Sequence, residues 1–211
     1  MDILAKNIAQ FNEVLASQIP AETLQAFQKS AQDLEEKQTG SKSLKIGERF
    51  PDFQLSNFDG QMHSLKDLLK NKLVIAFLRG SWCPYCNLEI QALQNELHQF
   101  KAKDVNLIVI TPQPSNINAE WQQQQNAEFE ILSDKGNLLA KKLGIDIELQ
   151  EFVIPHYKAM GIDLLQINQT QQYSLPIPAV YVLDSHATVT YKFVNPDYMK
   201  RVNIEELLNQ L

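Results

Sequence analysis

The sequence predicts an α/β fold in which helices flank a central mixed β-sheet, with a helical extension at the N-terminus. Short apolar runs alternate with amphipathic segments after residue 46, and this alternation implies a largely parallel sheet covered on both faces. Two β-rich runs near the C-terminus, joined by a short turn, add an antiparallel hairpin at the sheet edge. Residues 1–45 instead follow a helical pattern and hold no evident chemistry.

The composition narrows the class of protein. The chain has 211 residues, of which 44% are hydrophobic and 21% charged, and this suits one globular domain with an appendage. Its net charge is −6 and it has no block of basic residues, so neither nucleic acid nor an anionic membrane is expected as a partner. Asp2 and Glu13 interrupt the N-terminal segment, unlike a secretory signal, so we expect a cytoplasmic protein.

The N-terminal extension contains two predicted helices. Ile3, Ile8, Phe11 and Leu15 fall near one face of the first helix. A proline starts the second helix, and its apolar residues recur at helical spacing: Leu24, Phe27, Ala31 and Leu34. Residues 35–43 are polar, contain turn formers and are predicted to be a linker. We expect this helical hairpin to pack against the main domain or a second subunit, and a partner-binding arm is the alternative.

The main domain is predicted to occupy residues 46–211. In its first half, strands are expected at 53–55, 73–78, 105–111 and 129–132. Helices are expected between and after them, at 65–70, 86–103, 119–126 and 138–143. The run at 105–111 is apolar throughout, so we expect it to be buried on both faces. The long helix at 86–103 turns four apolar side chains inward: Ile90, Leu93, Leu97 and Phe100.

An insertion follows at about 145–177, with a short helix expected near 152–160. Because it lies close to the cysteine motif in the predicted fold, it is either a lid or substrate wall, or decoration of the fold. The hairpin strands are expected at 178–183 and 188–194. A helix at 204–211 closes the chain.

The chemistry concentrates where the strand at 73–78 meets the next helix, in the segment Trp82-Cys83-Pro84-Tyr85-Cys86. These are the only two cysteines in the chain. A proline between them suits the first turn of a helix, so Cys83 is expected at the helix N-terminus. Free N–H groups and the helix dipole favour a thiolate there, and such a cysteine has a pKa of roughly 3.5–7.5. The motif predicts a redox site.

Three other interpretations of the cysteine pair are open. Both cysteines can be buried structural thiols, since free cysteine is often buried. A structural zinc site needs about four ligands, and the histidines occur singly with no second pair at ligand spacing: His63, His98, His156 and His186. An iron–sulfur cluster normally needs more thiolates than this chain has. A Cys-X-X-Cys beside a βαβ pattern is typical of a thioredoxin-like redox motif.

Four ordered blocks resemble the thioredoxin superfamily and, more narrowly, its peroxiredoxin-like (AhpC/TSA-type) family. The segment at 46–55 is similar to a G-x-x-x-P-x-F-x-L block, and the segment at 77–90 to an F-x-R-G-x-W-C-P-Y-C-N core. The segments at 175–184 and 194–198 are similar to two later blocks. The resemblance covers nearly four-fifths of the chain. It implies a thioredoxin-like fold, no metal and no other cofactor.

Carried over residue by residue, the resemblance makes Cys83 the attacking thiolate and Cys86 its resolving partner. Pro178 falls where thioredoxin-fold proteins keep a cis-proline that faces the motif, and a trans proline that starts an edge strand is the alternative. Trp82 either shields the site or packs in the core. Arg79 either lends positive charge to the thiolate or to a bound peroxide, or is a solvated residue at the strand end.

The chain also departs from the family pattern. Typical peroxiredoxins carry P-x-x-x-T/S-x-x-C, whereas Ala76 stands here at the proline position and Gly80 at the hydroxyl position. Ser81 comes one residue late. The arginine that typical peroxiredoxins place later in the chain is replaced by Pro178. These differences bring the site closer to a thioredoxin or glutaredoxin site on a peroxiredoxin-like frame.

The resemblance implies a thiol peroxidase that reduces hydroperoxides through Cys83. Cys86 then closes an intramolecular disulfide, which thioredoxin or a glutaredoxin/glutathione system reduces. The first alternative is a protein thiol–disulfide oxidoreductase that uses the same cysteines. The second is a redox-sensing adaptor whose N-terminal hairpin docks a partner. A homodimer is also left open.

Overall fold

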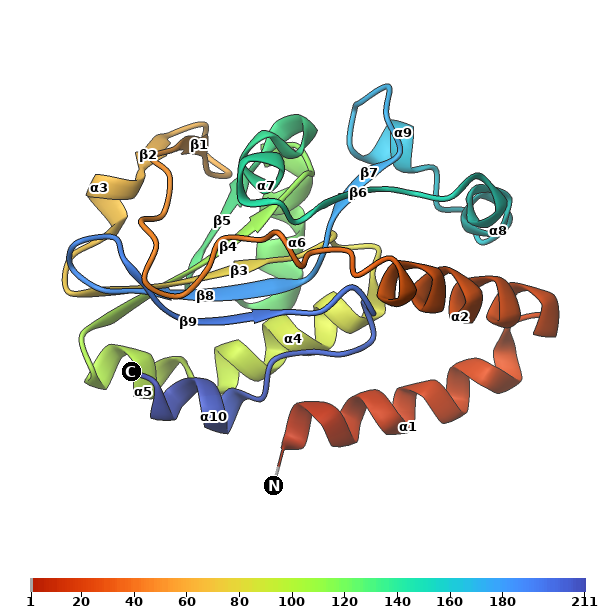
Figure 1. Ribbon diagram of the computed structural model, residues 1–211, viewed down its shortest axis with the longest axis horizontal. Coiled ribbons are helices and arrows are strands. Elements are labelled where there is room, and N and C mark those ends of the chain that lie inside the picture. Colours follow the sequence, from red (N-terminus) through yellow and green to blue (C-terminus); the bar gives the residue numbers. More distant parts are fainter. Residues whose placement is uncertain (1) are drawn as a thin grey trace.

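Seven strands form one mixed sheet in a computed structural model, which describes residues 2–211 (Figure 1). The strand order is β2-β1-β5-β4-β3-β8-β9. The strands are β1 (Gln54–Ser56), β2 (Met62–Ser64), β3 (Lys72–Phe77), β4 (Val105–Thr111), β5 (Glu130–Ser133), β8 (Ala179–Leu183) and β9 (Val189–Val194). The predicted α/β class with a mixed sheet is therefore confirmed.

The expectation of a largely parallel sheet is wrong. β3 pairs in parallel with β4, and β4 with β5, whereas the pairs that flank them are antiparallel. Short turns join β1 to β2 and β8 to β9, and a short turn can join only antiparallel neighbours. Parallel pairing is thus limited to the strands that long crossovers connect.

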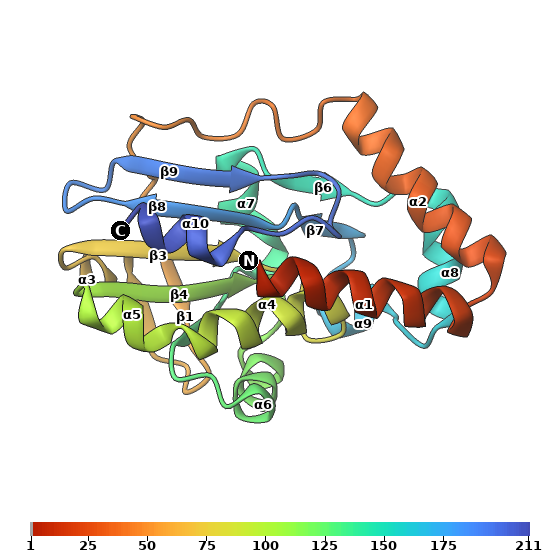
Figure 2. The ribbon, with the colours of Figure 1, turned by 90° about the horizontal axis from the view of Figure 1, so that it is seen from below.

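Helices cover both faces of the sheet. On one face lie α1 (Ile3–Gln18), α4 (Pro84–Asn95), α5 (Leu97–Ala102) and α10 (Ile204–Asn209), as both views show (Figures 1 and 2). Trp121 of α6 (Ser115–Gln125) belongs to the core on that face. Side chains of α3 (Leu65–Leu68) and α7 (Leu138–Leu143) pack in the core on the opposite face. No helix in this described chain is long and apolar enough to cross a membrane.

The core has two layers because buried strand residues alternate between the faces. In β3, Val74 and Ala76 join the layer under α4, whereas Ile75 and Phe77 join the opposite layer. β4 alternates in the same way, with every residue but Asn106 buried. The prediction that residues 105–111 are covered on both faces is confirmed.

The predicted helix at 86–103 is two helices. Glu96, with φ −98° and ψ 3°, ends α4 and begins α5. The bend keeps the inward stripe intact, since the four predicted residues are all buried: Ile90, Leu93, Leu97 and Phe100. The predicted hairpin at the sheet edge, the C-terminal helix and the helix at 138–143 are confirmed.

The N-terminal helices contact two different parts of the molecule. α1 lies on α4, where the rings of Phe11 and Tyr85 meet edge to face with centroids 5.3 Å apart, and Tyr85 Oη donates to Asn12 Oδ1 at 2.7 Å. The inward face of α1 holds Leu4 and Ile8. Ile3, which was predicted to lie on the apolar face, is 66% exposed. α1 therefore packs against the main domain.

The second helix, α2 (Ala21–Glu36), lies beside the insertion. The insertion contains five short elements: β6 (Asp146–Glu148), a 3₁₀ turn (Glu151–Val153), α8 (Ile154–Ala159), α9 (Leu164–Ile167) and β7 (Ser174–Pro176). β6 and β7 form a separate two-stranded sheet. Phe27 of α2 packs with buried insertion residues in a third apolar cluster. The division of the chain near residue 45 stays a prediction.

Candidate active site

The cysteine motif begins helix α4. Cys83 is the N-cap residue, with φ −92° and ψ 114°, and Pro84 occupies the first helical position. The backbone N–H groups of Cys86 and Asn87 donate to the carbonyl oxygen of Cys83 at 3.0 and 3.1 Å. Both cysteines are free thiols, with exposed fractions of 1% for Cys83 and 0% for Cys86. The two sulfurs therefore lie at a helix N-terminus, away from bulk water.

Arg201 lies against both sulfurs. Its Nη2 is 3.8 Å from Cys83 Sγ and 3.5 Å from Cys86 Sγ, while its Nη1 donates to Glu89 Oε2 at 2.6 Å. Its Nε donates to the carbonyl oxygen of Tyr198 at 2.8 Å, which fixes the guanidinium in the segment before α10. The Arg201–Glu89 ion pair is almost fully buried.

Sequence reasoning missed Arg201 and Glu89. Arg201 is 118 residues from Cys83, in a segment with no regular structure, so no local motif connects the two. One signal was available in the helix: Cys86, Glu89, Ile90 and Leu93 follow helical spacing, and all four are buried. A glutamate on a buried stripe requires a cationic partner.

Arg79 is buried with an exposed fraction of 2%, so the interpretation as a solvated residue is wrong. Its guanidinium carbon lies 4.2 Å from the ring centroid of Tyr198, 4.8 Å from that of Trp82 and 5.7 Å from that of Tyr157. Its Nη2 donates to the hydroxyl of Tyr157. Trp82 also meets Tyr157 edge to face, with centroids 5.6 Å apart. We call Trp82, Tyr157 and Tyr198 the aromatic cage of Arg79.

These neighbours give the two thiols opposite acidities. Burial alone would raise the pKa of Cys83, but the hydrogen bond from Cys86 and the charges of Arg79 and Arg201 lower it from 9.0 to about 5. Burial raises the pKa of Cys86 well above 9.0, and the hydrogen bond to Cys83 and its negative charge raise it further. Cys83 is therefore a thiolate at neutral pH and Cys86 a thiol.

Gly80 explains one departure from the family pattern. Its φ is +135°, and a Cβ atom there would lie 2.7 Å from the side chain of Gln113 and 2.9 Å from Trp82 Nε1. A residue with a side chain at this position, such as a hydroxyl-bearing one, would adopt a strained backbone conformation and would displace Gln113. The hydroxyl of Ser81 does not replace it freely, because Gln113 Nε2 donates to Ser81 Oγ at 3.2 Å and Ser81 N donates to Gln113 Oε1 at 2.6 Å.

The predicted cis-proline at Pro178 is wrong. No cis peptide bond occurs in the described residues, 2–211. The segment is held extended, because Ile177 N donates to Ile145 O at 2.7 Å and Ala179 already pairs with Phe77 in the sheet. An extended chain keeps the trans bond that X–Pro favours by about 0.5–1 kcal/mol. The alternative, a trans proline that starts an edge strand, is correct only in the trans bond. Pro178 is buried and precedes β8, which is an internal strand of the sheet.

Among residues 2–211, no three side chains of His, Cys, Asp or Glu gather closely enough to hold a metal ion. The geometry around the two sulfurs supports thiol chemistry. A thiolate beside two guanidinium groups is a nucleophile, and a thiol within the same helical turn can close a disulfide with it.

Known proteins share this chain's sequence pattern and fold. The model of the AhpC/TSA family matches residues 46–192. A putative peroxiredoxin bcp of Coxiella burnetii is 26% identical over 144 residues, which cover 68% of this chain and 94% of that protein. One of Buchnera aphidicola is 30% identical over 103 residues, which cover 49% of this chain and 65% of that protein.

A solved structure shares the fold. The crystal structure of peroxidoxin BcpB from Mycobacterium tuberculosis superposes with a TM-score of 0.62 at 17% identity, covering 79% of this chain and 96% of that one. A likeness at this identity concerns the fold alone and supports the thioredoxin-like prediction. The family match, by contrast, spans well over half of the sequence and contains both cysteines. The chain belongs to the AhpC/TSA family.

Proposed function

We propose that this protein is a thiol peroxidase of the peroxiredoxin type, with Cys83 as the peroxidatic cysteine and Cys86 as the resolving cysteine. The observation that carries the proposal is the buried Cys83 thiol, whose pKa is lowered to about 5 beside Arg79 and Arg201. A thiolate that is shut off from water and faces cationic donors suits a small, polarisable oxidant such as a hydroperoxide.

In the first step, the thiolate sulfur of Cys83 attacks one oxygen of the peroxide. The O–O bond breaks, the other oxygen leaves as water or an alcohol after taking up a proton, and Cys83 becomes a sulfenic acid. The thiol of Cys86 then attacks the Cys83 sulfur, an S–S bond forms and the sulfenic oxygen leaves as water. Arg201 faces both sulfurs, so its charge supports each step.

An external dithiol reduces the Cys83–Cys86 disulfide by two exchange steps and completes the cycle. We propose thioredoxin or a glutaredoxin/glutathione system for this role, in the cytoplasm, where such reductants operate. Since both sulfurs are buried, the surrounding chain must move before a protein reductant can reach them.

A disulfide reductase is less well supported. Such an enzyme presents an exposed sulfur beside a flat apolar surface, whereas Cys83 is 1% exposed and faces a guanidinium group. The burial therefore favours a small substrate over a protein disulfide.

The test is the rate at which the pre-reduced protein reacts with hydrogen peroxide, followed by tryptophan fluorescence, with an unperturbed thiolate as control. We expect a rate several orders of magnitude above the control, and a product whose mass shows an intramolecular disulfide. A rate equal to the control together with fast reduction of insulin would support the disulfide reductase instead. Negligible turnover with every reductant would point to the redox-sensing adaptor.

A further inference from the structure

Arg79 is a buried cation without a carboxylate partner. Within residues 2–211 it forms no ion pair, and its Nε has no hydrogen-bond acceptor. Its single side-chain hydrogen bond runs from Nη2 to the hydroxyl of Tyr157. A buried charge requires compensation, and here the groups that favour the charge of Arg79 are the Cys83 thiolate and the neighbouring polar atoms of Tyr157, Tyr198 and Cys86.

The rings of the aromatic cage restrain Arg79 but do not by themselves orient it. Stacking on the rings of Tyr198 and Trp82, at 4.2 and 4.8 Å, confines the guanidinium plane. Rotation within that plane would still redirect its N–H groups. The hydroxyl of Tyr157 removes this freedom, because a hydrogen bond to a charged donor is directional and strong. Tyr157 is therefore the contact that decides where the charge of Arg79 points.

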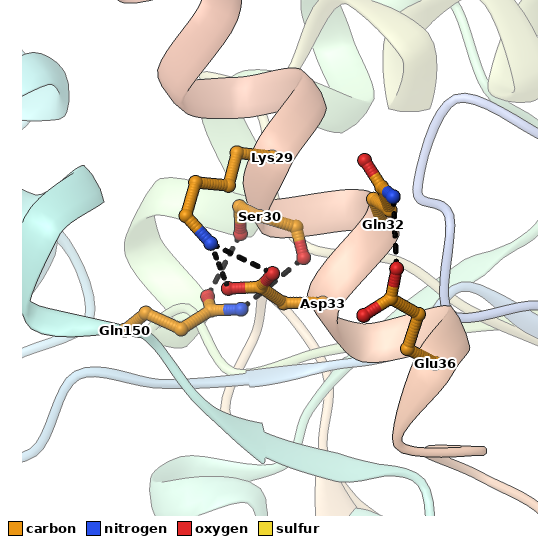
Figure 3. Close-up of polar contacts among 6 residues, drawn as sticks. All are labelled: Lys29, Ser30, Gln32, Asp33, Glu36 and Gln150. Atoms are coloured by element: carbon orange, nitrogen blue, oxygen red, sulfur yellow. Dashed lines mark hydrogen bonds and ion pairs between the residues drawn. The ribbon is translucent and has the colours of Figure 1, made fainter.

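Tyr157 belongs to α8, in the insertion, and not to the framework that carries the cysteines. α2 fixes α8 in place: Phe27 packs on Tyr157 with centroids 4.9 Å apart, and the hydroxyl of Thr23 lies 3.0 Å from His156 Nδ1. Just before the 3₁₀ turn, Gln150 pairs with Ser30 through two hydrogen bonds of 2.8 and 3.1 Å (Figure 3).

We propose that Tyr157 is a positioning residue that holds the guanidinium of Arg79 toward the Cys83 thiolate, so that the insertion sets the reactivity of the peroxidatic cysteine. The effect on peroxidatic reactivity rests on the proposed function, whereas the contacts between Tyr157 and Arg79 do not depend on it. It gives the insertion at 145–177 a role: it is a wall of the active site that acts through a charge.

The experiment compares Tyr157→Phe with the wild-type protein. Phenylalanine keeps the ring between Phe27 and Trp82 and removes only the hydroxyl. The thiolate of the reduced protein is titrated by its ultraviolet absorbance and, independently, by the pH dependence of iodoacetamide alkylation. We expect the pKa of Cys83 to rise by about 1, since a nearby opposite charge lowers a pKa by roughly 1–3.

Tyr173→Phe is the matched control. Tyr173 is a partly buried tyrosine of the same insertion, but its ring lies 5.8 Å from Lys158 Nζ and it makes no described contact with Arg79. We expect its Cys83 pKa to equal that of the wild type. An equal rise in both variants would overturn the proposal, because a general loosening of the insertion would then explain the effect.

A double-mutant cycle with Arg79→Met shows whether Tyr157 acts through Arg79. We expect the double variant to titrate like Arg79→Met alone, because the hydroxyl has no further effect once the guanidinium is gone. Additive shifts, or a wild-type titration in Tyr157→Phe, would overturn the positioning role. Neither readout uses peroxide, so failure of the peroxidase proposal would appear separately, as a slow reaction of the wild-type protein with hydrogen peroxide.

Discussion

Cys83 and Cys86 lie within one helical turn and share one arginine, yet their acidities move in opposite directions. Arg201 Nη2 is 3.5 Å from Cys86 Sγ and 3.8 Å from Cys83 Sγ, so proximity to this charge does not decide which sulfur ionises. Both thiols are buried to the same extent. The difference lies in what else surrounds each sulfur.

Cys83 has two advantages over Cys86. Its sulfur accepts a hydrogen bond from Cys86, and it lies near a second cation, Arg79. Cys86, in contrast, has the negative sulfur of Cys83 as a neighbour, which adds to the effect of its burial. Two cysteines of one motif are thus divided into a nucleophile and a proton-bearing partner by their position relative to each other and to Arg79.

The largest expected effects come from removing each sulfur. Cys83→Ser abolishes all turnover, because the nucleophile is gone. Cys86→Ser allows one oxidation of Cys83 by peroxide, after which the sulfenic acid is overoxidised or forms mixed disulfides. Intact-protein mass spectrometry after one equivalent of peroxide distinguishes these states. Turnover by Cys83→Ser would contradict the assignment of Cys83 as the nucleophile, and wild-type behaviour of Cys86→Ser would contradict the resolving role of Cys86.

The next largest effects concern stability, where substitutions of the two arginines are expected to differ. Arg201→Met leaves Glu89 buried without its partner, and we expect the free energy of unfolding to fall by about 3–5 kcal/mol. Arg79→Met leaves only the hydroxyl of Tyr157 unpaired, at a cost of about 1–3 kcal/mol. Denaturant titrations of the two reduced variants measure both values.

A double variant, Glu89→Leu with Arg201→Met, is the control for this comparison. Replacing both partners of a buried ion pair by apolar groups restores much of the stability. It does not restore the positive charge at the sulfurs, so we expect stable protein with a slow reaction at Cys83. If the reaction were as fast as in the wild type, Arg201 would have no role beyond its ion pair with Glu89.

Stability is also expected to depend on pH. Because the folded pKa of Cys83 is about 5 and its ordinary value is 9.0, the thiolate contributes stability that is fully present above pH 9 and is lost as the pH falls through 5. Burial raises the pKa of Glu89, which acts in the opposite direction. The difference in unfolding free energy between wild type and Cys83→Ser isolates the cysteine, and a difference that did not grow from pH 5 to 9 would contradict the assignment.

Local patterns predicted the framework well. The alternation of apolar runs located β3, β4 and the closing hairpin, and Pro84 placed Cys83 at the start of α4 because a proline fixes the first helical turn. β2 was missed, since three residues with one exposed end carry too little periodicity to be recognised. The bend at Glu96 was missed because the apolar spacing continues through it.

The surroundings of the sulfurs were harder to predict, because they come from distant parts of the chain. Arg201, Tyr157 and Tyr198 come from segments far from the cysteines in sequence, and none lies in a local motif with them. Arg79 was a candidate because it lies near Cys83 in sequence, but its burial depends on a cage assembled from three segments. Long-range packing, unlike helix or strand periodicity, leaves no regular spacing in the sequence.

The ion pair of Arg201 with Glu89 has a consequence for the redox potential of the dithiol. In the part of the chain that the structure describes, two buried guanidinium groups lie near the sulfurs, and Glu89 forms an ion pair with one of them, Arg201. The Cys83 thiolate supplies the second negative charge. A disulfide is neutral, so oxidation leaves an excess positive charge in a site shut off from water. These charges stabilise the reduced form relative to the neutral disulfide, so we expect them to shift the couple to a more oxidising potential. We therefore expect a disulfide between Cys83 and Cys86 to be reduced easily.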